Sequence, residues 1–256
     1  MNFFKYQGTG NDFVMIDNRD NFFPVSNLSL IRKICHRKFG IGADGLILLQ
    51  NKSSFDFEMI YFNPDGTQSL CGNGSRCAVK FANFLGLINQ EAQFLAVDGS
   101  HYAFIATDRV HLKMHDIAKV VRKDPKTFFI NTGSPHHICW VNDVKKLDVY
   151  QSGRTIRYSE DYEAEGTNVN FAEVQSDATV FVRTYERGVE DETLSCGTGV
   201  TAVALSSSFL NSESPVRIKT LGGELEVSFQ KDQEGNFSQI FLIGPAEMVF
   251  AGEYEI

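Results

Sequence analysis

Strand-like runs, one alternating between apolar and polar residues and others more continuously apolar, occupy much of the first half of the chain and predict β-strands. A hairpin is expected over 3–17, because Gly8, Gly10 and Asn11 are residues that accept turn conformations. Further strands are predicted at 46–50, 56–62, 93–97, 102–107 and 109–114. Apolar residues at helical spacing predict helices at 29–39, with Ser29 as candidate N-cap, and at 75–85.

The second half shows the same preference for strands. They are predicted at 127–132, 137–143, 168–174, 179–185, 216–220, 224–230, 239–243 and in the tail 246–256. A helix should follow Cys196, whereas 119–125 is polar and is interpreted as a crossing segment and 147–159 is mixed. The chain is thus expected to be rich in strands, with few helices.

Landmarks in the two halves recur at nearly one offset. Cys71 and Cys196, each followed by Gly-x-Gly, are 125 positions apart. The turns that begin at Thr9 and Thr132, and the aromatic residues Phe62 and Tyr185, are each separated by 123 positions. A repeat of this length indicates a duplicated domain, with a boundary between 116 and 125.

Composition narrows the class of protein. The 256 residues are 43% hydrophobic and 22% charged, as in ordinary soluble globular proteins. A net charge of −8 argues against nucleic acid as a partner. No apolar run approaches the roughly 20 residues that span a bilayer, and the first residues do not resemble a signal peptide, so no membrane partner is expected.

The five cysteines form an odd and sparse set, which suits a reducing cytoplasm better than a disulfide framework. There is no C-x-x-C pair, and His111 and His115 lie in a strand-like run where their spacing does not converge on a metal. We therefore expect no metal site.

Cys71 and Cys196 each stand at the predicted start of a helix, where the helix dipole favours a thiolate and can also hold a carboxylate. Most cysteines are simply buried small residues, but two in equivalent positions call for a common explanation. If the two copies face one another, a thiol lies on each side of a bound α-carbon, and this arrangement suits two-base racemisation or epimerisation. The two thiols would titrate as a coupled pair. Backbone amides at 72–74 and 197–199 could then stabilise the carbanion without pyridoxal phosphate.

The motifs now identify a resemblance. The segments YQGTGNDFVMID, GIGADG, FNPDGTQSLCGNGSRC, EGTNVNF and ERGVEDETLSCGTG resemble diaminopimelate epimerases over essentially the whole chain. The resemblance implies an isomerase that needs no cofactor and interconverts LL- and meso-diaminopimelate in lysine and peptidoglycan-precursor synthesis. It also implies a homodimer and an α+β fold of two pseudo-symmetric domains, each a mostly antiparallel, barrel-like sheet around a central helix. In this family the last strand returns to the first domain, so the expected domains are 1–117 with 245–256, and 118–244, with the active site in the cleft between them.

The resemblance also assigns residues to roles. Cys71 and Cys196 resemble the acid/base pair. The shell around the reacting centre corresponds to Asn11, Gly72, Asn73, Gly197 and Thr198, and the shell around the distal centre to Asn63, Asn168 and Arg187. Glu186 and His136 resemble residues that tune the thiols and hold the reacting amino group. Asn11 and Asn63 could instead be turn residues, Arg187 a surface ion pair, and His136 a hydrogen-bonded loop histidine.

Three departures from the family pattern stand out. Ser134 replaces a common asparagine, Gly45 replaces a glutamine of some members, and the segment 189–193 is more acidic than usual. The alternatives are a proline or hydroxyproline racemase of the same fold, a thiol peroxidase or redox sensor, and a protein that binds diaminopimelate without catalysis. A PhzF-like isomerase is less consistent with the paired cysteines.

Overall fold

The computed structural model describes residues 1–255 and divides into two compact units. Unit 1 comprises Met1–Leu112 and the chain from Gly244 on, and unit 2 comprises Lys113–Ile243. Residues 113–117, which the sequence analysis assigned to the first domain, belong to unit 2. The reason is backbone pairing, since Met114 N donates to Ile240 O and Ile117 N donates to Phe237 O, both at 2.8 Å.

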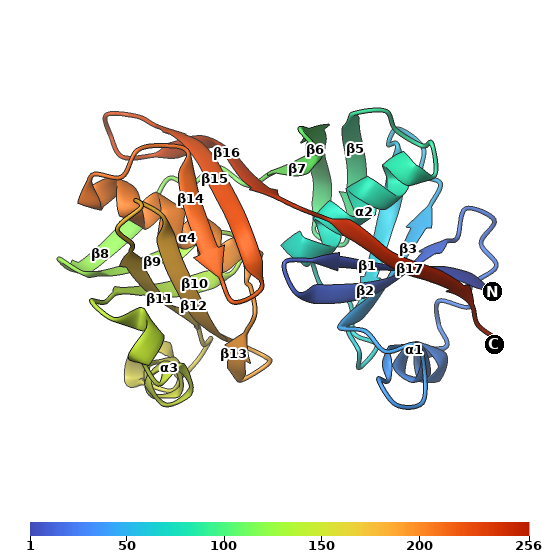
Figure 1. Ribbon diagram of the computed structural model, residues 1–256, viewed down its shortest axis with the longest axis horizontal. Helices are drawn as coiled ribbons and strands as arrows, with labels where there is room; N and C mark the ends of the chain where they lie inside the picture. The colour runs from blue at the N-terminus through green and yellow to red at the C-terminus, as the bar shows by residue number, and fades with distance from the viewer. Residues whose placement is uncertain (256) are drawn as a thin grey trace. The chain divides into compact units, whose positions relative to one another are not determined.

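Unit 1 contains a mixed sheet around one long helix (Figure 1). Its elements are β1 (Asn2–Gly8), β2 (Asn11–Asp17), α1 (Leu28–Cys35), β3 (Gly45–Gln50), β4 (Phe57–Phe62), α2 (Gly72–Phe84), β5 (Glu91–Ala96), β6 (Gly99–Ala106), β7 (Arg109–Lys113) and β17 (Glu247–Glu253). The pairs β1–β2, β3–β4, β5–β6 and β6–β7 are antiparallel, and β2–β3 and β4–β5 are parallel. Helix α2 contacts β1, β2, β3, β4 and β6, so the sheet curves around it.

Unit 2 repeats this plan. Its strands are β8 (Val120–Asp124), β9 (Thr127–Asn131), β10 (Pro135–Trp140), β11 (Asn168–Val174), β12 (Val180–Glu186), β13 (Asp191–Thr193), β14 (Val216–Thr220), β15 (Gly223–Lys231) and β16 (Phe237–Gly244). Its helices are α3 (Val149–Arg157), α4 (Gly197–Ser207) and the 3₁₀ turns η1 (Val144–Lys146), η2 (Glu160–Tyr162) and η3 (Ser208–Leu210). Helix α4 contacts β9, β10, β11, β12, β14 and β15, much as α2 contacts the strands of unit 1.

The order of strand pairings shows the duplication directly. β9–β10 is antiparallel, β10–β11 parallel, β11–β12 antiparallel, β12–β14 parallel and β14–β15 antiparallel, in the order found from β1 to β6. In unit 2 the first strand, β9, is flanked by β8, which directly precedes it. In unit 1 the equivalent flank of β1 is filled by β17, from the far end of the chain. The predicted α+β class, with a sheet around a central helix in each of two repeated units, is confirmed.

One predicted segment was wrong, and another was described only as mixed. The segment taken as a crossing contains β8, and the mixed segment contains α3. Four of the five residues of β8 are exposed, so β8 lacks the alternation from which a strand could be recognised. Helix α3 does place Val149, Gly153 and Ile156 on one face, but this helical spacing is short and lies among polar residues. Helix α1 is also shorter than predicted, and its cap is Asn27, whose side chain accepts from Leu30 N, rather than Ser29.

The two central helices are buried far more completely than ordinary surface helices. Nine of the thirteen residues of α2 and ten of the eleven residues of α4 are buried. Helix α4 is apolar on nearly all sides, as expected for a helix inside a fold, whereas α2 also buries the polar Asn73, Ser75 and Arg76, which are hydrogen-bonded. The N-terminus of each helix is therefore held firmly by the surrounding strands.

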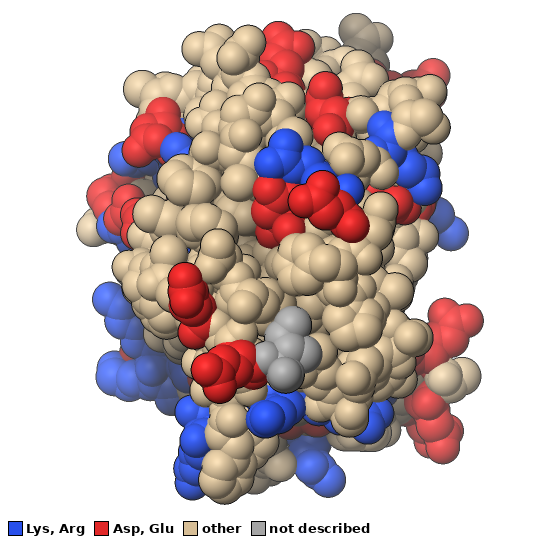
Figure 2. Space-filling model, turned by 90° about the vertical axis from the view of Figure 1, so that its right-hand side faces the viewer, with Lys and Arg blue, Asp and Glu red and all other residues tan. Residues whose placement is uncertain are grey.

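Charged side chains of both signs are interspersed on the face drawn in Figure 2, between large uncharged areas. Within residues 1–255, no helix is both long and apolar enough to cross a membrane.

Candidate active site

Cys71 is the N-cap of α2. Its backbone is extended, and its sulfur accepts a hydrogen bond from Gly74 N at 3.5 Å. The side chain is neither fully buried nor fully exposed. The predicted position of Cys71 at a helix N-terminus is confirmed, and the helix begins three residues earlier than expected. The thiol therefore lies at the N-terminus of the helix, where Gly74 N of the first turn donates to it.

A network of amides links this helix start to the β1–β2 turn. Asn73 Nδ2 donates to Asn11 Oδ1 at 2.5 Å, and Asn11 Nδ2 donates to Asp44 Oδ2 at 3.1 Å. Asp44 in turn pairs with Arg37 at 2.6 Å. Asn11, Gly72 and Asn73, all predicted for the reacting centre, thus lie together beside Cys71.

Arg76 on α2 also contacts the β1–β2 turn, and the sequence analysis did not identify it. It is completely buried and donates to Thr9 Oγ1 at 3.1 Å and to the Pro245 carbonyl at 3.3 Å. Burial lowers the pKa of its guanidinium to about 10, while the neighbouring Cys77 and Cys71 act in the opposite direction. Arg76 therefore ties the helix, the β1–β2 turn and the start of the returning strand into one support for Cys71. In the sequence, the indication of this role was that Arg76 follows Cys71 by five residues, within the first turns of the predicted helix.

Asn63 lies in the turn after β4. Its Nδ2 donates to Thr67 Oγ1 at 3.0 Å, and its Oδ1 accepts from Ser69 Oγ at 3.2 Å. These contacts form a loop that precedes Cys71 in the sequence. These contacts are those of a turn residue, which was one of the two interpretations of Asn63. The role of Asn63 in binding a distal centre stays a prediction.

Cys196 is the N-cap of α4 and is 8% exposed. Its sulfur lies 3.5 Å from Thr198 Oγ1, and Thr198 Oγ1 lies 2.9 Å from His136 Nε2. His136 is completely buried, and burial, assisted by the charge of Arg187, lowers its pKa to about 3. Cys196, Gly197, Thr198 and His136 thus lie together, as predicted, and His136 is a neutral imidazole at physiological pH.

Asn168 and Arg187 form a second group in unit 2. Asn168 donates through Nδ2 to Ser134 Oγ at 2.8 Å and to Pro135 O at 3.0 Å, and its Oδ1 accepts from Arg187 N at 2.9 Å. The Arg187 guanidinium donates to Glu165 O at 2.8 Å and is exposed. Glu186 accepts from Thr193 Oγ1 at 2.8 Å. Asn168 therefore holds the backbone of Arg187 in place through the hydrogen bond to Arg187 N.

The three departures from the family pattern have local explanations. Ser134 accepts the hydrogen bond from Asn168 described above. At Gly45, an added Cβ would lie 2.3 Å from Tyr61 Cε2, so a glutamine does not fit without moving Tyr61. In the acidic segment, Glu192 pairs with Arg183 at 2.6 Å, which holds β13 on β12.

The remaining cysteines are unlike Cys71 and Cys196 in position. Cys35 and Cys77 are buried and Cys139 is partly buried, and burial raises the pKa values of Cys35 and Cys139 to about 11 and raises that of Cys77 further. All three stay protonated thiols at neutral pH. Within residues 1–255, no group of three His, Cys, Asp or Glu side chains is arranged to hold a metal ion.

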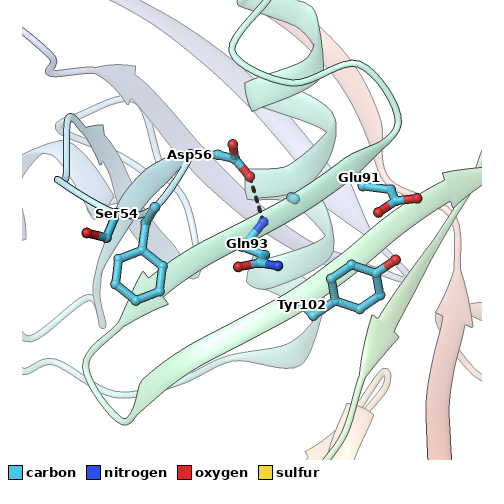
Figure 3. Close-up of a pocket in the computed structure, with 7 residues that line it drawn as sticks. Ser54, Asp56, Glu91, Gln93 and Tyr102 are labelled. Atoms are coloured by element: carbon cyan, nitrogen blue, oxygen red, sulfur yellow. Dashed lines mark hydrogen bonds between the residues drawn. The ribbon is translucent and has the colours of Figure 1, made fainter.

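A separate hollow of about 470 Å³ lies on unit 1 beside β5 and β6 (Figure 3). Asp56 and Glu91 lie at its edges, and Asp56 already accepts a hydrogen bond from Gln93 N at 2.7 Å. Its lining contains none of the residues predicted for the site.

Comparison with solved structures identifies the fold class of the chain. The fold matches a solved PhzF-family phenazine biosynthesis protein of Bacillus anthracis with a TM-score of 0.78 at 15% identity, over 100% of this chain and 99% of that chain. It also matches a probable proline racemase of Agrobacterium radiobacter K84 with a TM-score of 0.65 at 13% identity, over 100% and 93% of the two chains. These likenesses establish a two-unit fold shared with racemases and PhzF-type proteins.

The family follows from the sequence relatives. The family model of diaminopimelate epimerase matches residues 3–110 and 128–249. A diaminopimelate epimerase of Flavobacterium psychrophilum is 50% identical over 254 residues, covering 98% of both chains, and one of Aquifex aeolicus is 41% identical over 275 residues, covering 98% of this chain and 97% of its own. The chain belongs to the diaminopimelate epimerase family, a family of isomerases.

Proposed function

We propose that this chain interconverts LL- and meso-diaminopimelate by two-base proton transfer between Cys71 and Cys196, without a cofactor. The observation that supports it best is that both central helices of the repeat begin at a cysteine N-cap. In this proposal one thiolate removes the α-proton, and the other thiol delivers a proton to the opposite face of the planar carbanion. The two cysteines exchange roles for the reverse reaction.

The two helix N-termini would stabilise the negative charge of the carbanion. A substrate carboxylate bound at the amides of Gly72, Asn73, Gly197 and Thr198 would gain from both helix dipoles as negative charge develops. Fixed dipoles of this kind need no reorganisation during the reaction, and this is how proteins stabilise charged transition states. Asn11 is assigned to the same centre because it accepts from Asn73.

We assign the distal amino-acid centre to Asn63, Asn168 and Arg187. The Arg187 side chain is exposed, and its guanidinium donates one hydrogen bond to Glu165 O. The other N–H groups of the guanidinium can bind the second carboxylate of diaminopimelate in a forked arrangement. Proline, the substrate of a proline racemase, has no second carboxylate for such a residue to bind. An unchanged KM in Arg187→Ala would argue against this assignment, for which the expected KM increase is at least about tenfold. Glu186 is assigned to the reacting amino group.

The test is proton NMR of LL-diaminopimelate in D₂O with the purified protein under reducing conditions and no added cofactor. We expect loss of the α-proton signal and appearance of the meso isomer. Cys71→Ala and Cys196→Ala should each abolish both changes, and Cys139→Ala, a matched loss of a thiol elsewhere in unit 2, should not. Wild-type turnover in either of the first two variants contradicts the two-base mechanism.

Other outcomes would redirect the proposal. Exchange at proline instead of diaminopimelate would indicate the racemase alternative, and rapid peroxide turnover would indicate a thiol redox protein. The proposal includes a homodimer in the cytoplasm, where the five free cysteines stay reduced. Sedimentation equilibrium tests the dimer.

A further inference from the structure

A continuous chain of buried and partly buried hydrogen bonds leads from the core of unit 2 to the thiol of Cys196. It runs from Thr184 on β12 through Asn170 on β11 and His136 on β10 to Thr198 on α4. His136 and Asn170 are completely buried, and Thr184 is 3% exposed. The members come from three adjacent strands and the helix that they surround.

The orientation of the Asn170 amide is fixed by its neighbours. Its Nδ2 lies 3.3 Å from the His137 carbonyl, which can only accept, and its Oδ1 accepts from Thr184 Oγ1 at 2.9 Å. The second hydrogen of Nδ2 therefore points at His136 Nδ1, 3.1 Å away. His136 Nδ1 has to accept this hydrogen bond, so it carries no proton.

The histidine tautomer follows. A neutral imidazole with a bare Nδ1 carries its proton on Nε2, and Nε2 lies 2.9 Å from Thr198 Oγ1. His136 thus donates to Thr198, and the hydroxyl proton of Thr198 can turn toward Cys196 Sγ at 3.5 Å. When Cys196 is a thiolate, only the hydroxyl can donate in this contact. Thr132 Oγ1 holds the Thr198 carbonyl at 2.9 Å and so keeps the hydroxyl in place.

The equivalent positions of unit 1 do not carry this chain. In the parallel pair β2–β3, Phe13 and Gly45 are partners, as His136 and Asn168 are in β10–β11. An added Cβ on Gly74 would contact Ile47 and Phe13, whereas one on Gly199 would lie 2.4 Å from Asn170 Oδ1. Apolar Phe13 and Ile47 thus stand where unit 2 has His136 and Asn170, and the two thiols of the repeat are supported differently.

We infer that Asn170 is a positioning residue that holds His136 in the Nε2–H form, so that His136 acts through the Thr198 hydroxyl as a hydrogen-bond donor that stabilises the Cys196 thiolate. His136 is then not a base toward Cys196, because its one free lone pair is occupied by Asn170. The inference rests on the proposed role of Cys196 in proton transfer. The charged group that acts on His136 is Arg187, which directly follows β12.

The first measurement is the ¹⁵N chemical shifts of the His136 ring in the intact protein at pH 7. We expect a protonated Nε2 and a bare Nδ1. In Asn170→Asp a carboxylate faces Nδ1 in nearly the same volume, and Nδ1 should become protonated. A wild-type ring that carries a proton on Nδ1 overturns the inference.

The second measurement is the pH dependence of Cys196 alkylation, resolved by mass spectrometry of its peptide. Thr198→Val keeps the shape and removes the hydroxyl, and we expect the pKa of the Cys196 thiol to rise by about one unit, a tenfold loss of thiolate below that pKa. Thr198→Ser should restore the wild-type profile. Thr201→Val, which removes a buried hydroxyl bonded to Gly197 O on the same helix, is the matched control and should leave it unchanged.

An unchanged Cys196 profile in Thr198→Val overturns the inference. Both measurements are made without diaminopimelate. A protein that shows the predicted tautomer and shift but exchanges no α-proton would refute the proposed function alone, and active enzyme with a different tautomer would refute the inference alone.

Discussion

His136 and His137 are neighbours in β10, and both are held neutral by burial. Their side chains lie on opposite faces of the strand, with His136 toward Asn170 and Thr198 and His137 toward Tyr162, whose hydroxyl is 2.8 Å from His137 Nδ1. Burial is the main cause that lowers their pKa values, to about 3 and about 4. The native state therefore binds fewer protons than the unfolded chain, in which a histidine titrates near pH 6.5.

We predict that the free energy of unfolding falls as the pH falls below about 6.5. Below this pH the unfolded state takes up protons that the native state refuses, and the stability is fully present only above it. Each histidine should contribute up to about 2 kcal/mol to the loss between pH 7 and pH 5. Urea unfolding at several pH values measures the slope, which His137→Gln should reduce. An identical slope in wild type and His137→Gln contradicts this account.

At the scale of elements, the two central helices are alike in position but differ in what surrounds their first turn. Gly74 and Gly199 occupy the same place in the two C-G-x-G motifs. An added Cβ on Gly74 would be 3.1 Å from the flexible end of Ile47, whereas on Gly199 it would be 2.4 Å from Asn170 Oδ1. The equivalent glycines therefore have different physical reasons to be glycine.

We predict that Gly199→Ala destabilises the protein by about 1–3 kcal/mol and that Gly74→Ala is close to neutral. Gly199→Ala has to displace a buried, hydrogen-bonded amide, which costs as much as a typical overpacked core. In Gly74→Ala the higher helix propensity of alanine, about 1 kcal/mol, offsets a small adjustment of Ile47. Urea unfolding of the two variants provides the comparison. Equal losses in both would show that the Asn170 contact does not decide the effect.

For the whole molecule, the duplication shows how the two units complete the same sheet with different strands. Unit 2 flanks its first strand, β9, with β8, which directly precedes it, whereas unit 1 flanks β1 with a strand distant in the sequence. β17 fills this place along β1, from Asn2 opposite Glu253 to Gln7 opposite Glu247. The Pro245 carbonyl just before it also accepts from the buried Arg76. The end of the chain is thus part of the support of Cys71.

We predict that removal of residues 245–256 weakens unit 1 selectively. The edge of β1 would lose its hydrogen bonds, and Arg76 would lose a buried acceptor. Hydrogen exchange should become fast in β1, β2 and α2 and stay slow in β10, β11 and α4. Equal protection in both units, or equal loss, would show that β17 does not act on unit 1 alone.

The sequence by itself determined the elements and residues whose signals are local. Short apolar or alternating runs predicted most strands, the repeated spacing predicted the duplication, and the glycines after Cys71 and Cys196 predicted the two helix N-termini, since these depend on neighbouring residues. It did not reveal β8, because an exposed edge strand carries no apolar period, and the helical spacing of Val149, Gly153 and Ile156 in α3 was too short to separate from its polar surroundings.

Only the tertiary structure decided how distant residues support the two cysteines. Asn170 lies two positions after Asn168, and this spacing placed both on one face of a strand, but their partners are 14 to 34 residues away in sequence. Arg76 contacts Pro245 across 169 positions. Such contacts arise because strand pairing and burial bring remote polar groups together, and each buried group has to find a partner there.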